Sequence, residues 1–290
     1  MGSAVLACCL KKRHAAFIMA WEKTMKQYCD YHVHSHHSLD AACSIREMAE
    51  AAVQAGLSEI CFTDHVEFED PECRDNPADL AAQRAEVERE QPALPVRLLR
   101  GAEIGITPDA SFAEQAMAYI APAQVDFIIG SVHRVGEENA YRPGYFMERD
   151  RQAAYCGYLE QLAASVRTLP QLSVLGHYDY VAKRAPYAQR AVRYADLPEA
   201  FDDILRYLAQ QGKGLEVNTA SWRDDAPWGI DVLARFVELG GEFVTFGSDA
   251  HVPGQVGKRL KEARALALAA GVRYTATFRG LVPHFFPIEV

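Results

Sequence analysis

The sequence predicts a single α/β domain in which about seven parallel strands form a barrel-like sheet. Three observations carry this prediction. Short apolar runs follow one another after residue 27, segments with helical periodicity lie between them, and polar side chains end most of the runs. Alternating strands and helices favour parallel strands joined by helical crossovers. An open, doubly wound sheet is the alternative arrangement.

Each apolar run has the length and composition of a strand that is buried on both faces. The runs are QYCDYHVH (27–34), SEICFTDH (58–65), VRLLRGAEI (96–104), VDFIIGSVH (125–133), LSVLGHYD (172–179), GLEVNTA (214–220) and EFVTFGSDAH (242–251). In a parallel barrel, the carboxyl ends of all strands and the loops after them form one face. We therefore expect the polar ends of these runs to meet on one rim.

Helical spacing of apolar residues marks several of the connecting segments. The clearest is SIREMAEAAVQAG (44–56), in which Ser44 and Glu47 have the spacing of a capping box and Gly56 can end the helix. Similar segments are RQAAYCGYLEQLAASVRTL (151–169), LPEAFDDILRYLAQQG (197–212), WGIDVLARFVELGG (228–241) and GKRLKEARALALAAG (257–271). No low-complexity segment divides the chain, so we expect one domain over residues 25–290.

Composition and charge exclude several classes of protein. The 290 residues are 49% hydrophobic, which is enough for a large core, and the formal net charge is −9. A negative protein repels nucleic-acid phosphates, and the longest basic run is KKR (11–13), so we expect no nucleic-acid partner. Seven cysteines without a C-x-x-C motif predict reduced thiols in a cytoplasmic protein.

The first 24 residues are interpreted as a dispensable or disordered extension. Their apolar run precedes their basic residues, which is the reverse of a signal peptide, and it is too short to cross a bilayer. We expect no membrane partner, and Met25 is a candidate for the true start. The sequence does not indicate an oligomeric state.

Six of the ten histidines end an apolar run and predict a metal site. They are His32, His34, His65, His133, His177 and His251, and Glu103 and Asp249 occupy equivalent positions. A single histidine at such a place is usually a hydrogen-bonded loop residue, but six with carboxylates beside them indicate metal ligands. His36 and His37, in the same stretch DYHVHSHHSLD (30–40), are interpreted as solvent-exposed loop residues.

The ligand types and their number indicate the metals. Neutral imidazole and carboxylate suit Zn²⁺, Mn²⁺ and Fe²⁺. Strict alternation points His32 and His34 to the same face of a strand, and a bend or a frayed end lets both rings reach one ion. The ligands exceed the needs of one tetrahedral ion, so we expect two or three divalent ions, with Glu103 and Asp249 as bridging carboxylates.

The ordered set of motifs resembles the PHP superfamily, which is named for polymerase and histidinol phosphatase. The motifs are HVH (32–34), TDH (63–65), GAEI (101–104), SVH (131–133), GHYD (176–179), EVNT (216–219) and GSDAH (247–251). The resemblance covers residues 28–290, and the opening stretch through TDH is most similar to the monofunctional histidinol-phosphatases. It implies a distorted seven-stranded (β/α)7 barrel, similar to a TIM barrel, with a trinuclear metal site at its carboxyl-terminal face.

The resemblance also assigns the ligands. It implies a first ion bound by His32, His34, Glu103 and Asp249, a second by Glu103, His133 and His177, and a third by His65 and His251. Some members of the superfamily have a further histidine after H-x-H. Asp40 stands at the corresponding place here, so a carboxylate would replace an imidazole at the third ion.

The activity that the resemblance implies is hydrolysis of a phosphomonoester, with L-histidinol phosphate as the lead substrate in histidine biosynthesis. Clustered divalent ions can neutralise the phosphate oxygens and lower the pKa of an attacking water. Arg184 and Arg223 follow strand ends and are candidates for binding the phosphate, with Lys183 a weaker one. Asp64 is a candidate either for orienting a metal-bound imidazole or for protonating the leaving group.

Three other functions compete with this interpretation. A PHP-type phosphoesterase that acts on another small phosphorylated metabolite or nucleotide has the same site. A non-catalytic metal-binding module would not need so complete a set of ligands. An amidohydrolase-like barrel shares H-x-H on its first strand but places a lysine at the end of a middle strand, and no lysine ends a predicted strand here.

Overall fold

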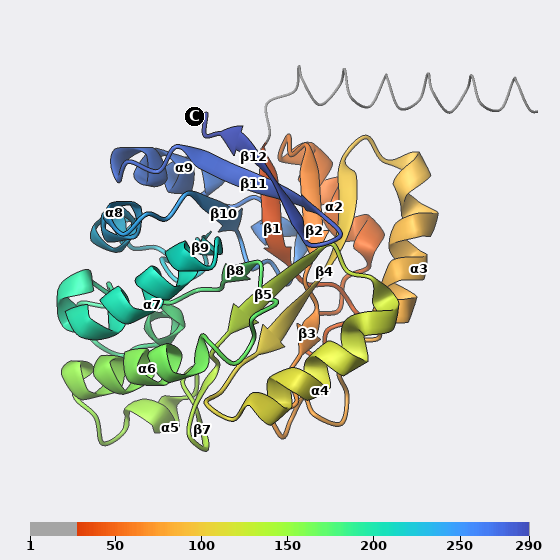
Figure 1. The fold of residues 1–290 in the computed structure, drawn as a ribbon. Helices are drawn as coiled ribbons and strands as arrows, with labels where there is room; N and C mark the ends of the chain where they lie inside the picture. Colours follow the sequence, from red (N-terminus) through yellow and green to blue (C-terminus); the bar gives the residue numbers. More distant parts are fainter. Residues whose placement is uncertain (1–27, 290) are drawn as a thin grey trace, which may run out of the picture.

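The structure, a computed structural model, describes residues 28–289. The expectations for the first 24 residues and for a start at Met25 lie outside the described residues. The fold of the described part is mixed α/β with a mostly parallel sheet, as the sequence predicts (Figure 1).

Ten strands form the main sheet. They are β1 (Cys29–Val33), β2 (Glu59–Phe62), β3 (His65–Val66), β4 (Arg97–Gly105), β5 (Phe127–Ser131), β8 (Val174–Leu175), β9 (Gly214–Asn218), β10 (Phe243–Gly247), β11 (Tyr274–Arg279) and β12 (Val282–Pro287). Their order is β1-β2-β4-β5-β8-β9-β10-β11-β12, and β3 pairs with β4. All pairs are parallel except β11 with β12. A separate small hairpin joins β6 (Arg134–Val135) and β7 (Glu138–Asn139).

Helices surround the outside of this sheet (Figure 1). They are α2 (Ile45–Gln54), α3 (Leu80–Glu90), α4 (Ala110–Ile120), α5 (Pro143–Phe146), α6 (Arg151–Ser165), α7 (Pro198–Gln210), α8 (Ile230–Glu238) and α9 (Leu260–Ala269). Short 3-10 helices are η1 (Gln91–Ala93), η2 (Ala121–Ala123), η3 (Tyr180–Lys183), η4 (Tyr194–Asp196) and η5 (Pro253–Gln255). The predicted capping box of α2 is present. The Ser44 hydroxyl accepts a hydrogen bond from the Glu47 N–H, and the Glu47 carboxylate accepts one from the Ser44 N–H.

All seven predicted runs contain a strand, and the five predicted helices are present. The run at 58–65 is divided, because the chain leaves the sheet at Thr63 and Asp64 and returns as β3. The sequence interpretation did not include α3, α4 or the antiparallel β11–β12 hairpin. The hairpin follows the last predicted helix, where the regular alternation of strand and helix ends.

The first strand lies beside the chain that follows β10. The His34 N–H donates to the carbonyl of Ala250 at 2.9 Å, and Val33 and Ala250 form an isolated parallel bridge. Below this bridge the Asp30 carboxylate accepts hydrogen bonds from the backbone N–H groups of Ser248, at 2.9 Å, and Gly257, at 2.8 Å. These contacts join β1 to the chain that follows β10.

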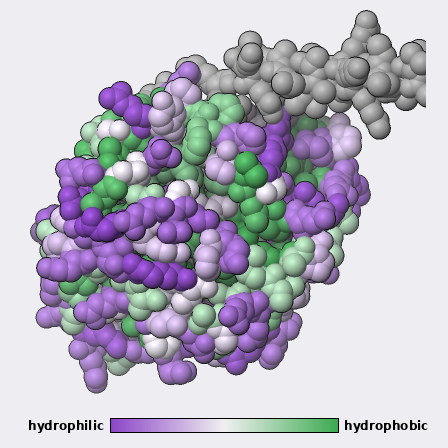
Figure 2. Space-filling view, viewed as in Figure 1, coloured by the Kyte–Doolittle hydropathy of each residue, from purple (hydrophilic) through white to green (hydrophobic). Residues whose placement is uncertain are grey.

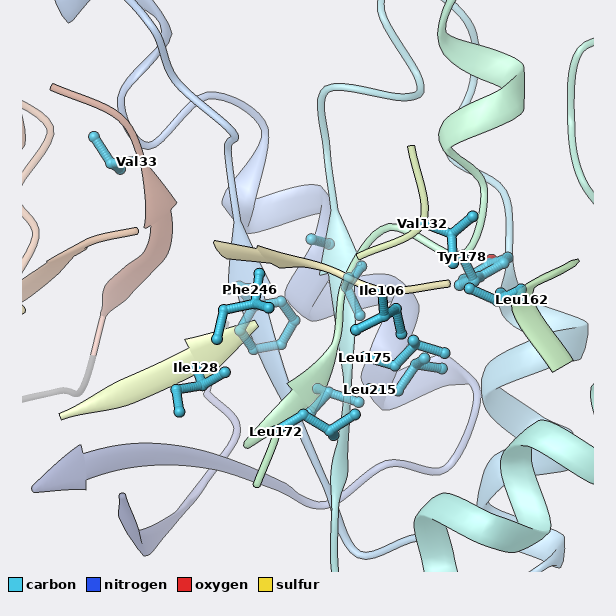
Figure 3. Packing of buried hydrophobic residues seen from close by; sticks show 14 of the residues in the cluster. Val33, Ile106, Ile128, Val132, Leu162, Leu172, Leu175, Tyr178, Leu215 and Phe246 are labelled. Atoms are coloured by element: carbon cyan, nitrogen blue, oxygen red, sulfur yellow. The ribbon is translucent and has the colours of Figure 1, made fainter. Parts of the chain in front are cut away.

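The larger hydrophobic cluster lies between the sheet and the helices. Figure 3 shows part of it, with Leu172 and Leu175 near Leu215 and with Ile128 farther away. Each of these four side chains is fully buried. This layer fixes the helices against the sheet and leaves the opposite side of the strands free for other contacts.

A second, smaller cluster packs the amino-terminal halves of the strands on their other face. Tyr31 contacts Phe127 edge-to-face with ring centroids 4.9 Å apart, and Phe278 of β11 lies 4.8 Å from Phe127. Along the same face the side chains become polar toward the carboxyl ends, as in Leu99 and then Glu103 on β4. The apolar half therefore supports a polar half at one end of the sheet.

The viewed surface is largely hydrophilic, with hydrophobic residues gathered around the β11–β12 hairpin (Figure 2). Val282 is 57% exposed and Phe285 is 48% exposed on this hairpin. Within residues 28–289, no helix combines the length and the apolar character that a membrane span requires.

Candidate metal centre

A bulge in β1 directs both histidines of the HVH motif toward the polar end of the sheet. The pairing with β2 shifts by one residue between Asp30 and Val33. Tyr31 belongs to the smaller hydrophobic cluster and Val33 to the larger one, on the opposite face of the sheet. The buried rings of His32 and His34 lie 5.1 Å apart. A bulge of this kind re-aims side chains beside it, which is the bend that the sequence argument required.

The orientation of His32 is fixed by a buried glutamate. Its Nδ1 lies 2.6 Å from the Glu216 carboxylate on β9, which leaves its Nε2 without a hydrogen-bond partner. Gly247 makes room for this pair, since a Cβ there would stand 2.2 Å from Oε1 of Glu216 and 2.5 Å from Cβ of His32. The free Nε2 is the atom available to a metal.

His34 is oriented in the same way by a serine. The Ser38 hydroxyl donates to Asp64 at 2.9 Å, so it accepts from Nδ1 of His34, which lies 3.1 Å away. The buried Nε2 of His34 then carries the lone pair and has no hydrogen-bond partner. Both imidazoles of the HVH motif therefore present Nε2 as a ligand atom, and a second residue fixes the tautomer of each.

Glu103 is the carboxylate around which the imidazoles gather. Its two oxygens lie within 3.5 Å of five rings. The separations are 3.2 Å to His32, 3.5 Å to His34, 3.1 Å to His65, 3.4 Å to His133 and 2.8 Å to His177. Its side chain is 1% exposed, and the Ser131 hydroxyl donates to it at 2.6 Å. A buried charge needs several such partners to offset the loss of water.

Asp249 holds a second carboxylate beside the first. One of its oxygens lies 3.4 Å from Nε2 of His34 and 3.6 Å from Nδ1 of His251. Its other oxygen accepts from Lys183. The backbone of Asp249 has a φ of 53°, a left-handed conformation that is uncommon for residues other than glycine. This conformation turns the Asp249 side chain into the centre.

Asp40 and Glu67 complete the set on the outer side. An Asp40 oxygen lies 2.9 Å from Nε2 of His251 and 3.5 Å from Nε2 of His65. Glu67 lies 2.5 Å from Nδ1 of His65 and 3.0 Å from Nδ1 of His133, and it is absent from the sequence prediction. The signal for it was its place two residues after His65, on the same side of the chain.

The residues fit divalent metal ions by the chemistry and position of their free atoms. Four overlapping groups have ligand atoms within 4.8 Å of one another. They are His32, His34 and Asp249; His32, Glu103 and His177; His65, Glu67 and His133; and His34, Asp40, His65 and His251. Buried atoms without a hydrogen-bond partner include Nε2 of His32 and of His34 and Oε2 of Glu103. A bound cation would coordinate such buried nitrogen and oxygen atoms, which otherwise have no hydrogen-bond partner.

The pKa shifts describe the same electrostatics. Burial would raise the pKa of Glu103, but the neighbouring His32 and His133 hold it well below its usual value. Burial and the nearby His251 and His65 lower the pKa of His34 to about 3, so its ring is neutral and able to bind a metal. His133 responds in the opposite direction, because Glu67 and Glu103 outweigh burial and raise its pKa to about 10. Metal binding would displace that proton.

Asp64 lies in a buried network of hydrogen bonds beside His34. Asp64 is fully buried and accepts from the Ser35 N–H at 2.6 Å, the Ser35 hydroxyl at 2.8 Å, the Ser38 hydroxyl at 2.9 Å and the Gln83 amide at 2.8 Å. These donors occupy both of its oxygens, and it does not line the cavity. Of the two roles considered for Asp64, this environment favours the orienting one, because Ser38 links its carboxylate to Nδ1 of His34.

A cavity of about 700 Å³ opens beside the centre. Its wall includes ligand candidates from every group, among them Asp40, His65, Glu103, His177 and Asp249. Six basic residues also line it, namely Arg142, Lys183, Arg184, Arg223, Lys258 and Arg259. The structure therefore places both predicted arginines beside the centre. Arg184 lies over the Tyr141 ring at 4.8 Å, and Arg223 donates to the carbonyl of Lys183 at 3.4 Å.

The PHP domain family matches residues 30–220. The chain belongs to the PHP domain family. A curated relative, the histidinol-phosphatase of Lactococcus lactis, is 34% identical over 257 residues, which is 87% of this chain and 94% of the relative. The probable histidinol-phosphatase of Deinococcus radiodurans is 32% identical over 281 residues, which is 88% of this chain and 98% of that one.

A solved PHP relative agrees in fold. The crystal structure of histidinol phosphate phosphatase from Lactococcus lactis, complexed with zinc, L-histidinol and phosphate, has a TM-score of 0.81 and 31% identity. The match covers 89% of this chain and 99% of that chain. A putative histidinol phosphatase from Listeria monocytogenes has a TM-score of 0.66 at 17% identity and shares the fold.

The Glu216 contact generates a test of this PHP centre. We expect Glu216→Gln to weaken metal binding by about 10-fold to 100-fold, because the substitution removes the charge that fixes the His32 tautomer. Competition with a chromophoric chelator measures the change. Glu238→Gln removes an exposed carboxylate on α8 and is the control. Equal metal affinity in Glu216→Gln and the control would show that Glu216 does not orient a ligand.

Proposed function

We propose that the chain hydrolyses L-histidinol phosphate to L-histidinol and phosphate as a metal-dependent phosphomonoesterase of histidine biosynthesis. The observation that carries the proposal is the cavity, which joins the imidazole–carboxylate centre to six basic side chains. The similarity to the Lactococcus lactis enzyme, whose structure holds zinc, L-histidinol and phosphate, supports this substrate.

The size and charge of the cavity favour a small, charged substrate. About 700 Å³ lies within the range of small-molecule sites. Basic side chains suit the phosphate, and acidic residues on the wall, such as Asp70 and Glu72, suit a cationic remainder. We propose no nucleic-acid substrate, since the basic residues near the centre line this small cavity and the chain carries a net charge of −9.

The proposed metal assignment follows the geometry. We propose two or three divalent ions of the Zn²⁺, Mn²⁺ or Fe²⁺ type, held by His32, His34, Asp40, His65, Glu103, His133, His177, Asp249 and His251, with Glu67 as a further ligand. When bound, these ions would neutralise charge on the phosphate oxygens and acidify the attacking water.

The chain's own residues would position the ester. Arg184 and Arg223 would donate hydrogen bonds to the phosphate oxygens, and the two candidates reach the cavity from the loops after β8 and β9. Lys183 is buried, and its contact with Asp249 raises its pKa against the effect of burial, so it stays charged. Its ammonium would hold the Asp249 carboxylate in place and add positive charge beside the phosphate.

The proposal also covers the extent of the domain, the closure of its sheet and its location in the cell. We propose that residues 25–290 form one catalytic domain and that its sheet closes into a distorted (β/α)7 barrel through the Val33–Ala250 bridge, which is supported by the hydrogen bond at 2.9 Å between His34 and Ala250. A cytoplasmic location is proposed from the cysteines, of which Cys43, Cys61, Cys73 and Cys156 are free thiols.

Phosphate release from L-histidinol phosphate tests the function. We expect metal-reconstituted protein to turn over this ester with a kcat/KM at least about 100-fold above that for an aryl phosphate, since remote contacts add binding energy in the transition state. A chelator should abolish turnover, and added zinc should restore it. Turnover that survives the chelator would exclude a metal-dependent reaction, and equal rates on both esters would exclude this substrate assignment.

Arg223 tests the phosphate site. We expect Arg223→Ala to lower kcat/KM by about 10-fold to 150-fold, because a hydrogen bond to a charged group contributes about 1.5–3 kcal/mol. Arg206, an exposed arginine on α7 outside the cavity, offers the control Arg206→Ala. Steady-state kinetics with L-histidinol phosphate measure both variants. Unchanged kinetic constants in Arg223→Ala would remove Arg223 from the phosphate site.

A further inference from the structure

A second convergence of ligand atoms lies outside the catalytic centre. His36 and His37, on the loop between β1 and α2, both direct Nε2 to the same oxygen of Glu86 on α3, each at 2.9 Å. This group shares no residue with the four groups of the centre. The sequence interpretation made both histidines solvent-exposed loop residues, which is confirmed for His36 and wrong for His37, whose side chain is largely buried.

The three ligand atoms lie close enough together to bind one ion, all within 4.8 Å of one another. In a tetrahedral site, zinc bonds to nitrogen and oxygen of roughly 2.0–2.2 Å place neighbouring ligand atoms about 3.4 Å apart. The two nitrogen–oxygen separations of 2.9 Å are hydrogen-bond distances, and they would widen by about 0.5 Å to admit an ion. The two imidazole rings stand edge-to-face with centroids 4.4 Å apart, so they approach the shared oxygen from different directions.

Burial makes the group more than a surface contact. The Glu86 side chain is 8% exposed and that of His37 is 10% exposed, while that of His36 is 41% exposed. The carboxylate is therefore held within the protein, and His36 leaves a path from solvent. The loop itself is fixed, because His36 N–H donates to the carbonyl of Cys43 at 2.8 Å and His37 N–H donates to the Ser35 hydroxyl at 3.3 Å.

We propose that His36, His37 and Glu86 bind a divalent cation of the zinc class at a site separate from the catalytic centre. Two imidazoles and one carboxylate suit a borderline ion and leave a coordination position for water. Glu86 also lies 3.5 Å from Arg89, which is 64% exposed, so this ion pair is weakened by solvent and leaves the carboxylate available.

The expected effect of this ion is to join the first ligand loop to α3. The loop carries His34 and Asp40 on its catalytic side, and its Ser35 already binds Asp64, which accepts from Gln83 on α3. Gln83 and Glu86 are three residues apart and so share one face of α3. An ion at Glu86 adds a second tie between the same loop and the same helix, and it should raise thermal stability.

Metal counting in variants tests the site. The full chain, stripped of metal and dialysed against micromolar free zinc, should bind one equivalent per chain more than Glu86→Gln or His36→Asn does. Glu86→Gln keeps an oxygen that accepts from the histidines, and His36 is partly exposed, so neither variant is expected to unfold. Glu88→Gln, an exposed carboxylate on the same helix, is the control and should keep the wild-type equivalents.

Thermal unfolding gives an independent readout. In chelator, the wild type and both variants should unfold at similar temperatures, and zinc in excess of the catalytic ions should then raise the midpoint further only in the wild type and in Glu88→Gln. Phosphatase activity in the same samples reports separately on the catalytic centre. Equal zinc equivalents in the wild type, Glu86→Gln and His36→Asn would overturn the site, whatever the substrate proves to be.

Discussion

The Glu103 carboxylate is the constraint on which the rest of the centre depends. Five imidazoles lie within 3.5 Å of its oxygens, and its side chain is almost completely buried. An isolated carboxylate in such a place would be expensive, so cations or hydrogen-bond donors must surround it. Histidines serve both needs, because a ring can carry a proton beside a carboxylate or offer its lone pair to a metal. The same arrangement therefore accommodates either protons or divalent ions.

The fold supplies what this cluster needs. The inward faces of the strands are apolar at their amino-terminal halves, where Tyr31, Phe127 and Phe278 pack, and polar at their carboxyl ends. A packed base keeps the polar end rigid, so that ligand atoms stay within a few tenths of an ångström of their partners. Local departures from regular strand geometry then aim individual side chains. The bulge before Val33 and the left-handed backbone at Asp249 are two such departures.

The sequence was informative where one residue type recurred at one structural position. Histidines that follow strands, such as His133 and His177, could be predicted because parallel strands bring their carboxyl ends together. Glu216 could not, because it is a single glutamate whose role depends on which imidazole lies opposite in space. For Glu67 the one signal was its place two residues after His65. Asp64 had two interpretations, and the serine and glutamine donors around it favour the orienting one. The β11–β12 hairpin was missed since it breaks the repeat that predicted the other strands.

Metal content of a Glu103 variant tests the central claim most directly. If the Glu103 carboxylate organises the cluster, Glu103→Gln should lose more than one divalent ion per chain relative to the wild type, because its oxygens contact rings from several ligand groups. Elemental analysis after reconstitution and dialysis gives the number. Wild-type metal content in a folded Glu103→Gln protein would contradict the account, since the imidazoles would then hold their ions without the shared carboxylate.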